Sequence, residues 1–187
     1  MSIPATVALL LALTSGCTAY MTQYNKNFTF ECPDGHALMT LESTSYANQG
    51  DRLWHFDCFS LDDVPLGVCE WSGFVNNLEK DINYKCGNDK VIAGLASNYT
   101  SKNRDRRWQF KCCPLGQNYI IHGCDFTPDL NAYYGQLAYT APDGFLISGI
   151  FGVFDYRKRD RVWRVDHCKM DKLSPAVGKR DVPNKTW

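Results

Sequence analysis

The sequence predicts an all-β protein of three similar units. The phrase Asp-Arg-x-Trp occurs at Asp51–Trp54, Asp105–Trp108 and Asp160–Trp163, and its tryptophans lie 54 and 55 residues apart. A fixed period in this range is typical of repeat architectures. Apolar and polar residues alternate around each phrase, as in half-buried strands, and no long helical periodicity with caps is visible. We expect the units to close around an axis as in a β-prism, or alternatively a β-trefoil, because closure protects strand edges.

The two ends of the chain differ in character from its middle. Residues 3–14 form an uncharged apolar run too short to span a membrane, and small residues follow it, so residues 1–19 are predicted to be a secretory signal peptide. No other stretch is apolar enough to span a bilayer. Residues 20–172 are predicted to form one domain, and residues 173–187 a flexible tail. The three repeats are expected at approximately 28–66, 82–115 and 137–170.

Each unit is expected to contain an opening strand, a turn, a second strand and a motif strand. The alternation of Phe28, Phe30 and Cys32 with polar residues predicts the first opening strand. The Pro-Asp-Gly sequence at 33–35 predicts a turn, because Pro presets φ and Gly tolerates positive φ. The second strands are expected at 37–45, 91–99 and 145–154. In each motif strand Arg and Trp share one face, since successive side chains alternate.

The cysteines predict a disulfide framework. Removal of Cys17 with the signal peptide leaves eight of the nine cysteines, an even number that is typical of secreted proteins. The spacing predicts two bond types, each made twice: Cys32–Cys58 and Cys86–Cys112 span 26 residues, and Cys69–Cys113 and Cys124–Cys168 span 44. Ala141 occupies the opening position of the third unit, which therefore lacks the first bond type. The rival pairing is Cys69–Cys112 with Cys86–Cys113. Glycosylation sequons at Asn27, Asn98 and Asn184 fit the same compartment.

Together these motifs resemble the dermatopontin family, also called tyrosine-rich acidic matrix protein. The resemblance covers approximately residues 24–172 and rests on Cys32–Gly35, Asp51–Cys58, Asp105–Cys113 and Asp160–Cys168. Two cysteines of the vertebrate pattern and its Tyr-rich acidic N-terminal stretch are missing, which favours an invertebrate-type member. The resemblance implies a secreted extracellular-matrix protein associated with proteoglycans, collagen fibrils and cell adhesion. Invertebrate relatives include haemagglutinating lectins and proteins of calcified matrices.

The repeated motif has a structural and a functional interpretation. In the structural one, each Arg stacks on or beside the Trp of the same strand face and pairs with a carboxylate, so that the unit locks one repeat to its neighbour. In the functional one, each copy lines a sugar pocket, and three copies would give the multivalency that agglutination requires. The structural interpretation is favoured, because a strand face that also carries Phe and Cys is normally core. The residues concerned are Asp51, Arg52, Trp54, Asp105, Arg106, Trp108, Asp160, Arg161 and Trp163.

Basic residues beside the second and third motifs are the main candidates for binding. The formal net charge of the chain is zero, so any attraction to a charged partner must come from local patches. Arginine forks bind sulfate and carboxylate groups, and a sulfated glycosaminoglycan is the extracellular polyanion to expect. Nucleic acid is not an expected partner of such a chain. The predicted glycosaminoglycan-binding residues are Lys102, Arg104, Arg107, Arg157, Lys158, Arg159 and Arg164.

Neither catalysis nor a cofactor is expected. The four histidines are scattered, no metal motif is present, and cysteines in disulfides are not available as nucleophiles or zinc ligands. The predicted function is adhesion or matrix organisation through proteoglycans or sulfated glycosaminoglycans, with collagen or cell-surface glycans as further partners and an oligomer as a possible state. The alternatives are a carbohydrate-binding agglutinin used in defence and an organic-matrix protein of a mineralised tissue.

Overall fold

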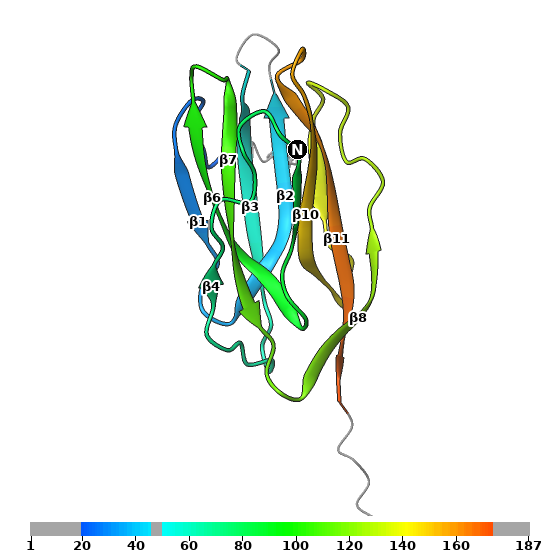
Figure 1. The fold of residues 1–187 in the computed structure, drawn as a ribbon. Helices are drawn as coiled ribbons and strands as arrows, with labels where there is room; N and C mark the ends of the chain where they lie inside the picture. Colours follow the sequence, from blue (N-terminus) through cyan, green and yellow to red (C-terminus); the bar gives the residue numbers. More distant parts are fainter. Residues whose placement is uncertain (1–19, 46–49, 174–187) are drawn as a thin grey trace, which may run out of the picture.

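Strands and loops make up the part of the chain that the computed structural model describes, residues 20–45 and 50–173, and no helix occurs there (Figure 1). The predicted signal peptide, most of the loop before Asp51 and the predicted tail after Leu173 lie outside these residues. The strands are β1 (Phe28–Glu31), β2 (His36–Ser45), β3 (Arg52–Ser60), β4 (Glu70–Trp71), β5 (Ile82–Lys85), β6 (Lys90–Thr100), β7 (Asp105–Pro114), β8 (Tyr119–Phe126), β9 (Leu137–Thr140), β10 (Phe145–Asp155) and β11 (Asp160–Lys172).

Three long antiparallel hairpins, β2–β3, β6–β7 and β10–β11, carry the three motifs in the same register. The motif arginine faces the last or penultimate residue of the preceding strand in each case, with the pairs Ser45–Arg52, Tyr99–Arg106 and Phe154–Arg161. Each hairpin also has one register shift at the corresponding place, after Leu38, Ile92 and Ile147. Equal spacing in the sequence has therefore produced equal pairing in space.

Each opening strand pairs with a hairpin other than the one that follows it in the chain. β1 pairs with β6, β5 pairs with β10, and β9 pairs with β2, all antiparallel. The three exchanges form a closed cycle, so every hairpin is flanked by a strand from the opening segment of another. The sequence pattern associates each opening strand with its own unit and does not predict this exchange.

Two further strands come from the connecting segments. β4 pairs with β7 and β8 pairs with β11, which completes two four-stranded sheets beside the three-stranded sheet of β3, β2 and β9. Both strands lie between the repeats expected from the sequence, and neither was predicted. β8 is largely exposed and therefore lacks the half-buried alternation on which strand prediction depends.

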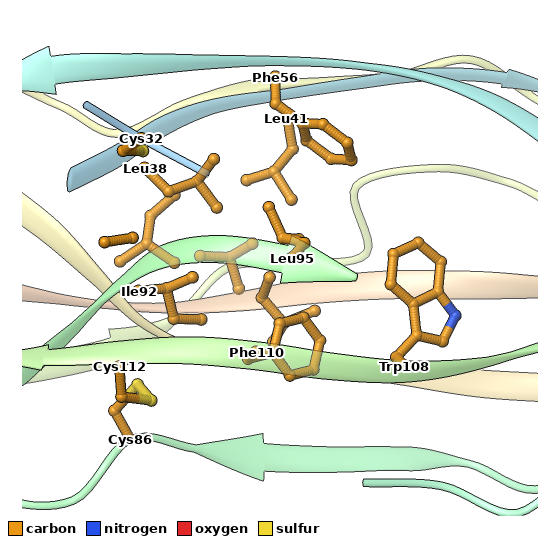
Figure 2. Packing of buried hydrophobic residues seen from close by; sticks show 14 of the residues in the cluster. Cys32, Leu38, Leu41, Phe56, Cys86, Ile92, Leu95, Trp108, Phe110 and Cys112 are labelled. Atoms are coloured by element: carbon orange, nitrogen blue, oxygen red, sulfur yellow. A yellow bond between two sulfur atoms is a disulfide. The ribbon is translucent and has the colours of Figure 1, made fainter. Parts of the chain in front are cut away.

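The inner faces of the three hairpins form one apolar core. Equivalent positions of β2, β6 and β10 contribute Leu41, Leu95 and Ile150, each no more than 3% exposed. The second strands of the first two hairpins, β3 and β7, add the aromatic side chains Phe56 and Phe110, and Figure 2 shows these packed between the sheets. Such interdigitated side chains from three sheets are what the alternating pattern of the strands provides.

Four disulfides join the cysteines that the repeat spacing paired. Cys32–Cys58 and Cys86–Cys112, with Cα atoms 5.6 and 5.8 Å apart, each connect an opening strand to the hairpin that follows it in the chain. Because that opening strand lies in the sheet of another hairpin, each bond crosses between two sheets. The other two bonds, Cys69–Cys113 and Cys124–Cys168, attach the connecting segments to β7 and β11.

The third junction between sheets has a hydrogen bond where the others have a disulfide. Ala141 follows β9, and His167 of β11 occupies the position of Cys58 and Cys112. The side chain of Tyr139 forms a hydrogen bond with Nδ1 of His167. Burial raises the pKa of Tyr139 to about 12, so the phenol stays protonated at physiological pH. This junction is consequently the one without a covalent link.

Cysteines introduced together at Ala141 and His167 are expected to form a third disulfide between sheets. The new bond would close a loop with the same 26-residue separation as the two natural ones. The free energy of unfolding should rise by about 2–4 kcal/mol, because the cross-link restricts the unfolded chain. Denaturant unfolding under oxidising conditions measures this change, and the Ala141→Cys single variant is the control. A double variant whose two new thiols remain free in mass spectrometry would contradict the equivalence of the three junctions.

Candidate functional site

The three motifs form a closed ring of buried ion pairs. Arg106 donates to Asp51 through Nε and Nη2 at 2.6 and 2.7 Å, and Arg52 donates to Asp160 at 2.7 and 2.8 Å. Arg161 completes the ring by donating to both oxygens of Asp105. Every pair joins two different hairpins, and the six side chains are 2–5% exposed. The ring therefore holds each hairpin to both of the others.

Backbone groups satisfy most of the remaining hydrogen-bonding capacity of the ring, and within the described residues Nε of Arg161 is left without a partner. Each Asp accepts one N–H, from Asn25, Glu79 or Tyr134, at 2.6–2.7 Å. These three residues have φ of 60–62°, a left-handed conformation that turns the N–H group towards the carboxylate. The arginines donate to the carbonyl groups of Lys26, Lys80 and Gly135. Hydrogen bonds of this kind offset much of the cost of burying the charges.

The three motif tryptophans meet in the core beside the ring. Their ring centroids are 5.1–5.2 Å apart, and the ring planes cross at 74–86°, the edge-to-face geometry that aromatic pairs prefer. Arg106 lies over Phe28 and Tyr99, and Arg161 lies over Phe154. Two of the three motif guanidinium groups thus stack on Phe or Tyr rings within the described residues, whereas the motif Trp was the ring expected from the sequence.

The space between the motif residues is too small for a sugar. The cavity that they line has a volume of about 30 Å³. Ligand pockets typically measure about 300–1,000 Å³. The geometry of Asp-Arg-x-Trp is therefore that of a packing unit, and binding has to be sought elsewhere on the surface.

Two of the hairpin tips bring five basic side chains to one end of the molecule, the upper end in Figure 1. Arg159 bonds to Glu79 and to the carbonyl oxygen of Asn103, which places the third tip against the second. The side chain of Arg104 packs closely against Gly50 of the first tip. A Cβ atom added to Gly50 would lie only 2.5 Å from Nε of Arg104. We call these five residues the tip cluster: Lys102, Arg104, Arg157, Lys158 and Arg159.

Two carboxylates accompany the tip cluster. Glu79 accepts a hydrogen bond from Arg159, which lowers the pKa of the glutamate below its ordinary value of 4.5. Asp155 accepts the backbone N–H groups of Lys158 and Arg157, which lower its pKa below 3.8. Both groups are ionised at neutral pH, but the five cations outnumber them. The tip end thus carries an excess of positive charge on a chain of zero net charge.

Arg107 and Arg164 do not join the tip cluster. Arg107 of β7 stacks on Phe74, with its Cζ atom 4.0 Å from the ring centroid. Arg164 of β11 is half exposed and pairs with Asp129 at 2.6 Å. Both side chains lie along the strands on the outer faces of their sheets. Arg107 and Arg164 are close in sequence to the tip residues and were therefore predicted to belong with them. Both lie within strands, however, where the alternation of side chains directs them to the outer faces of the sheets.

An open groove of about 420 Å³ lies on the outer face of the third hairpin, where β5 and β8 flank it, and we call it the lateral groove. This groove was not predicted from the sequence. A signal was available, because Phe151, Val153 and Val162 occupy strand positions that face outward and are apolar. The lining residues are Asp81, Ile82, Asn83, Phe126, Phe151, Gly152, Val153, Val162 and Arg164.

Other predicted sites have simple structural settings. Asn27 and Asn98 are exposed, as a glycan would require, and Asn184 lies outside the described residues. Cys124, Asp166 and Cys168 approach one another within the described ranges, but both cysteines are committed to a disulfide and are not metal ligands. Within residues 20–45 and 50–173 no helix has the length and apolarity needed to cross a bilayer.

These features define a disulfide-stabilised all-β protein with a cationic end and a lateral groove. Residues 22–172 match the profile of the dermatopontin family, and the chain belongs to that family. This result confirms the resemblance inferred from the motifs. No solved structure matched the chain.

Named relatives come from distant animals. The chain is 26% identical over 171 residues to the "Hemagglutinin/amebocyte aggregation factor" of Limulus polyphemus, with 91% of this chain and 98% of the relative covered. It is 29% identical to "Dermatopontin" of Biomphalaria glabrata, with 81% and 100% covered. It is 27% identical to "Dermatopontin" of Mus musculus, with 83% and 79% covered.

Replacing either member of an ion pair in the ring is expected to destabilise the fold strongly. Arg106→Ala or Asp51→Ala should each lower the free energy of unfolding by about 3–5 kcal/mol, because a buried charge is left uncompensated. The double variant should lose less stability than the sum of the two single losses. Denaturant unfolding of the natural protein, both single variants and the double variant measures this coupling. Asp105 adjoins Arg106 in the sequence but bonds to Arg161, so the cycle of Arg106 with Asp105 is the control. If the coupling energy of Arg106 with Asp105 equalled that of Arg106 with Asp51, the assignment of Asp51 as the partner of Arg106 would be wrong.

Proposed function

We propose that the protein is a secreted extracellular-matrix adhesion protein that binds sulfated glycosaminoglycans through the tip cluster. The observation that carries this proposal is the contact of Arg159 with Asn103, which brings together two hairpin tips that carry five basic side chains and are about fifty residues apart in the sequence. Membership of the dermatopontin family and the four disulfides support an extracellular matrix location.

The chemistry of the tip cluster suits a sulfated chain. Arg157 and Lys158 are exposed, and their side chains are supported by Tyr156 and Tyr133 through cation–π contacts. Side chains held in this way lose less conformational entropy on binding than free ones. A guanidinium group can bind a sulfate with two parallel hydrogen bonds, and an ammonium group adds a point charge. A linear polyanion could contact several of these groups at once.

We also infer that the domain at 20–172 consists of three copies of one unit in a β-prism-like arrangement. The shared register of the hairpins, the cyclic strand exchange and the ring of ion pairs support this interpretation. The units are those expected from the sequence, at approximately 28–66, 82–115 and 137–170. An experimental structure with no rotational relation between the hairpins would contradict it.

A second proposed function is that of a carbohydrate-binding agglutinin. The observation that favours it is the similarity, over nearly the full length of both chains, to a protein named as a hemagglutinin and aggregation factor. The lateral groove supplies a concave surface of the size that small ligands use. The two functions differ in the charge of the glycan, so salt dependence separates them.

Charge reversal at the tip is expected to weaken binding to heparin. Arg157→Glu with Lys158→Glu should lower the affinity about tenfold at physiological salt and shift elution from a heparin column to lower salt. Lys169→Glu with Lys172→Glu makes the same charge change at the far end of β11 and is the matched control. Equal losses in both proteins would mean that only net charge matters and that the tip cluster is no site.

Heparin retention is expected to be independent of pH between about pH 5.5 and 7.5. The four histidines lie outside the tip cluster, and the lowered pKa values keep Glu79 and Asp155 ionised across this range. Because both pKa values are lowered, these two carboxylates gain protons only at a pH below their ordinary pKa values of 4.5 and 3.8; the positive excess would then rise, and retention should strengthen. Elution from heparin at constant ionic strength measures the effect. A marked fall in retention between pH 6 and 7.5 would point to a histidine-dependent site instead.

A further inference from the structure

We propose that the lateral groove binds a neutral pyranose sugar, which deepens the second proposed function and rests on it. The groove is defined by the residues of β5, β8, β10 and β11 that line its volume of about 420 Å³. That volume lies within the range that small-ligand sites occupy. Nothing in the family resemblance or in the repeated motif assigns a role to this face.

Two phenylalanine rings form an apolar corner in the groove. Phe126 of β8 and Phe151 of β10 have ring centroids 4.7 Å apart and planes at 74°. Phe126 is 54% exposed although it is a large hydrophobic residue. A pyranose has one face of C–H groups, and packing that face on an aromatic ring removes apolar surface of both partners from water. The perpendicular rings would support a sugar from two directions.

Two valines extend the apolar surface along the strands. Val153 and Val162 face each other directly in the β10–β11 register, and Val153 is 50% exposed. A strand face that points to solvent usually carries polar residues. Exposed apolar side chains gathered into one concave surface, rather than scattered singly, indicate a site of interaction.

Polar groups at the rim provide both donors and acceptors. Asn83 lies opposite Phe151 in the β5–β10 register and is exposed. One oxygen of Asp81 accepts the backbone N–H of Phe154, which fixes the orientation of the carboxylate. Arg164 is held by Asp129 and stays half exposed. Sugar hydroxyls donate and accept hydrogen bonds, so an amide, a carboxylate and a guanidinium group around one apolar corner match their chemistry.

The charges around the groove favour a neutral ligand. Arg164 is already paired with Asp129, whereas the carboxylate of Asp81 accepts a backbone N–H group and forms no salt bridge within the described residues. The local balance is therefore negative rather than positive. A sulfated or carboxylated chain would be repelled here and attracted to the tip cluster. The two surfaces thus differ in the class of glycan that each can accept.

The groove is particular to the third hairpin. The positions that correspond to Phe151 carry Glu42 and Ala96 in the other two hairpins, as the shared register shows. Those that correspond to Val153 carry Thr44 and Asn98. One chain therefore offers one such groove in spite of its three similar units, and agglutination through it would require a second binding surface or a second copy of the chain.

The test compares Phe126→Ala with the natural protein on an array of neutral mono- and oligosaccharides, at physiological salt. We expect the natural protein to bind neutral sugars and the variant to lose about tenfold in affinity. Phe126→Tyr should restore binding, because it keeps the ring. Phe59→Ala is the matched control, since Phe59 is also 54% exposed but belongs to β3 outside the groove. Heparin retention should be equal in all these proteins.

Each other outcome overturns a defined part of the proposal. Neutral sugar binding that survives Phe126→Ala would remove the groove but leave the agglutinin function. No binding of any neutral sugar by the natural protein would remove both. Self-association that Phe126→Ala abolishes, without sugar binding, would show that the groove is a contact between copies of the chain. Circular dichroism and denaturant unfolding of every variant separate these results from a loss of fold.

Discussion

The fold depends on three buried ion pairs that no hairpin can satisfy alone. A carboxylate or guanidinium group removed from water costs several kcal/mol unless a partner and further hydrogen bonds compensate it. Asp51, Asp105 and Asp160 each find that partner on another hairpin, and a backbone N–H group from a left-handed residue completes each set. Because the donors and acceptors alternate around a closed ring, loss of one contact leaves two hairpins incompletely satisfied.

Because the ring stabilises the fold from inside, the residues on the outer surfaces can differ between the hairpins. Inside the molecule the hairpins repeat the same residue types at the same positions, as the three tryptophans do. Outside, equivalent strand positions carry unrelated side chains, such as Glu42 and Phe151. A scaffold whose stability comes from interior contacts tolerates such divergence, because surface substitutions away from special features have small effects on stability. A cationic end and an apolar groove can therefore exist on one chain.

More of the interior of this protein than of its surface could be predicted from the sequence. The all-β class and the cysteine partners followed from period and spacing, because both are properties of positions along the chain. The exchange of opening strands did not follow, since a strand pattern specifies a face and not a neighbour. Likewise, Arg164 belongs to a groove and Arg159 to the tip, although they are only five positions apart in the sequence. Strand β8 was missed because its side chains are mostly exposed.

The pairing of β9 with β2 links the order of synthesis to the order of folding. Leu41 of the first hairpin faces Tyr139, so the sheet that begins first is completed by a strand made almost one hundred residues later. During synthesis from the N-terminus, the outer edge of β2 remains unpaired until most of the domain has emerged. An unpaired edge can recruit another chain. The closed strand cycle, which covers the first strand of every hairpin in the finished molecule, thereby creates a period of exposure in the nascent one.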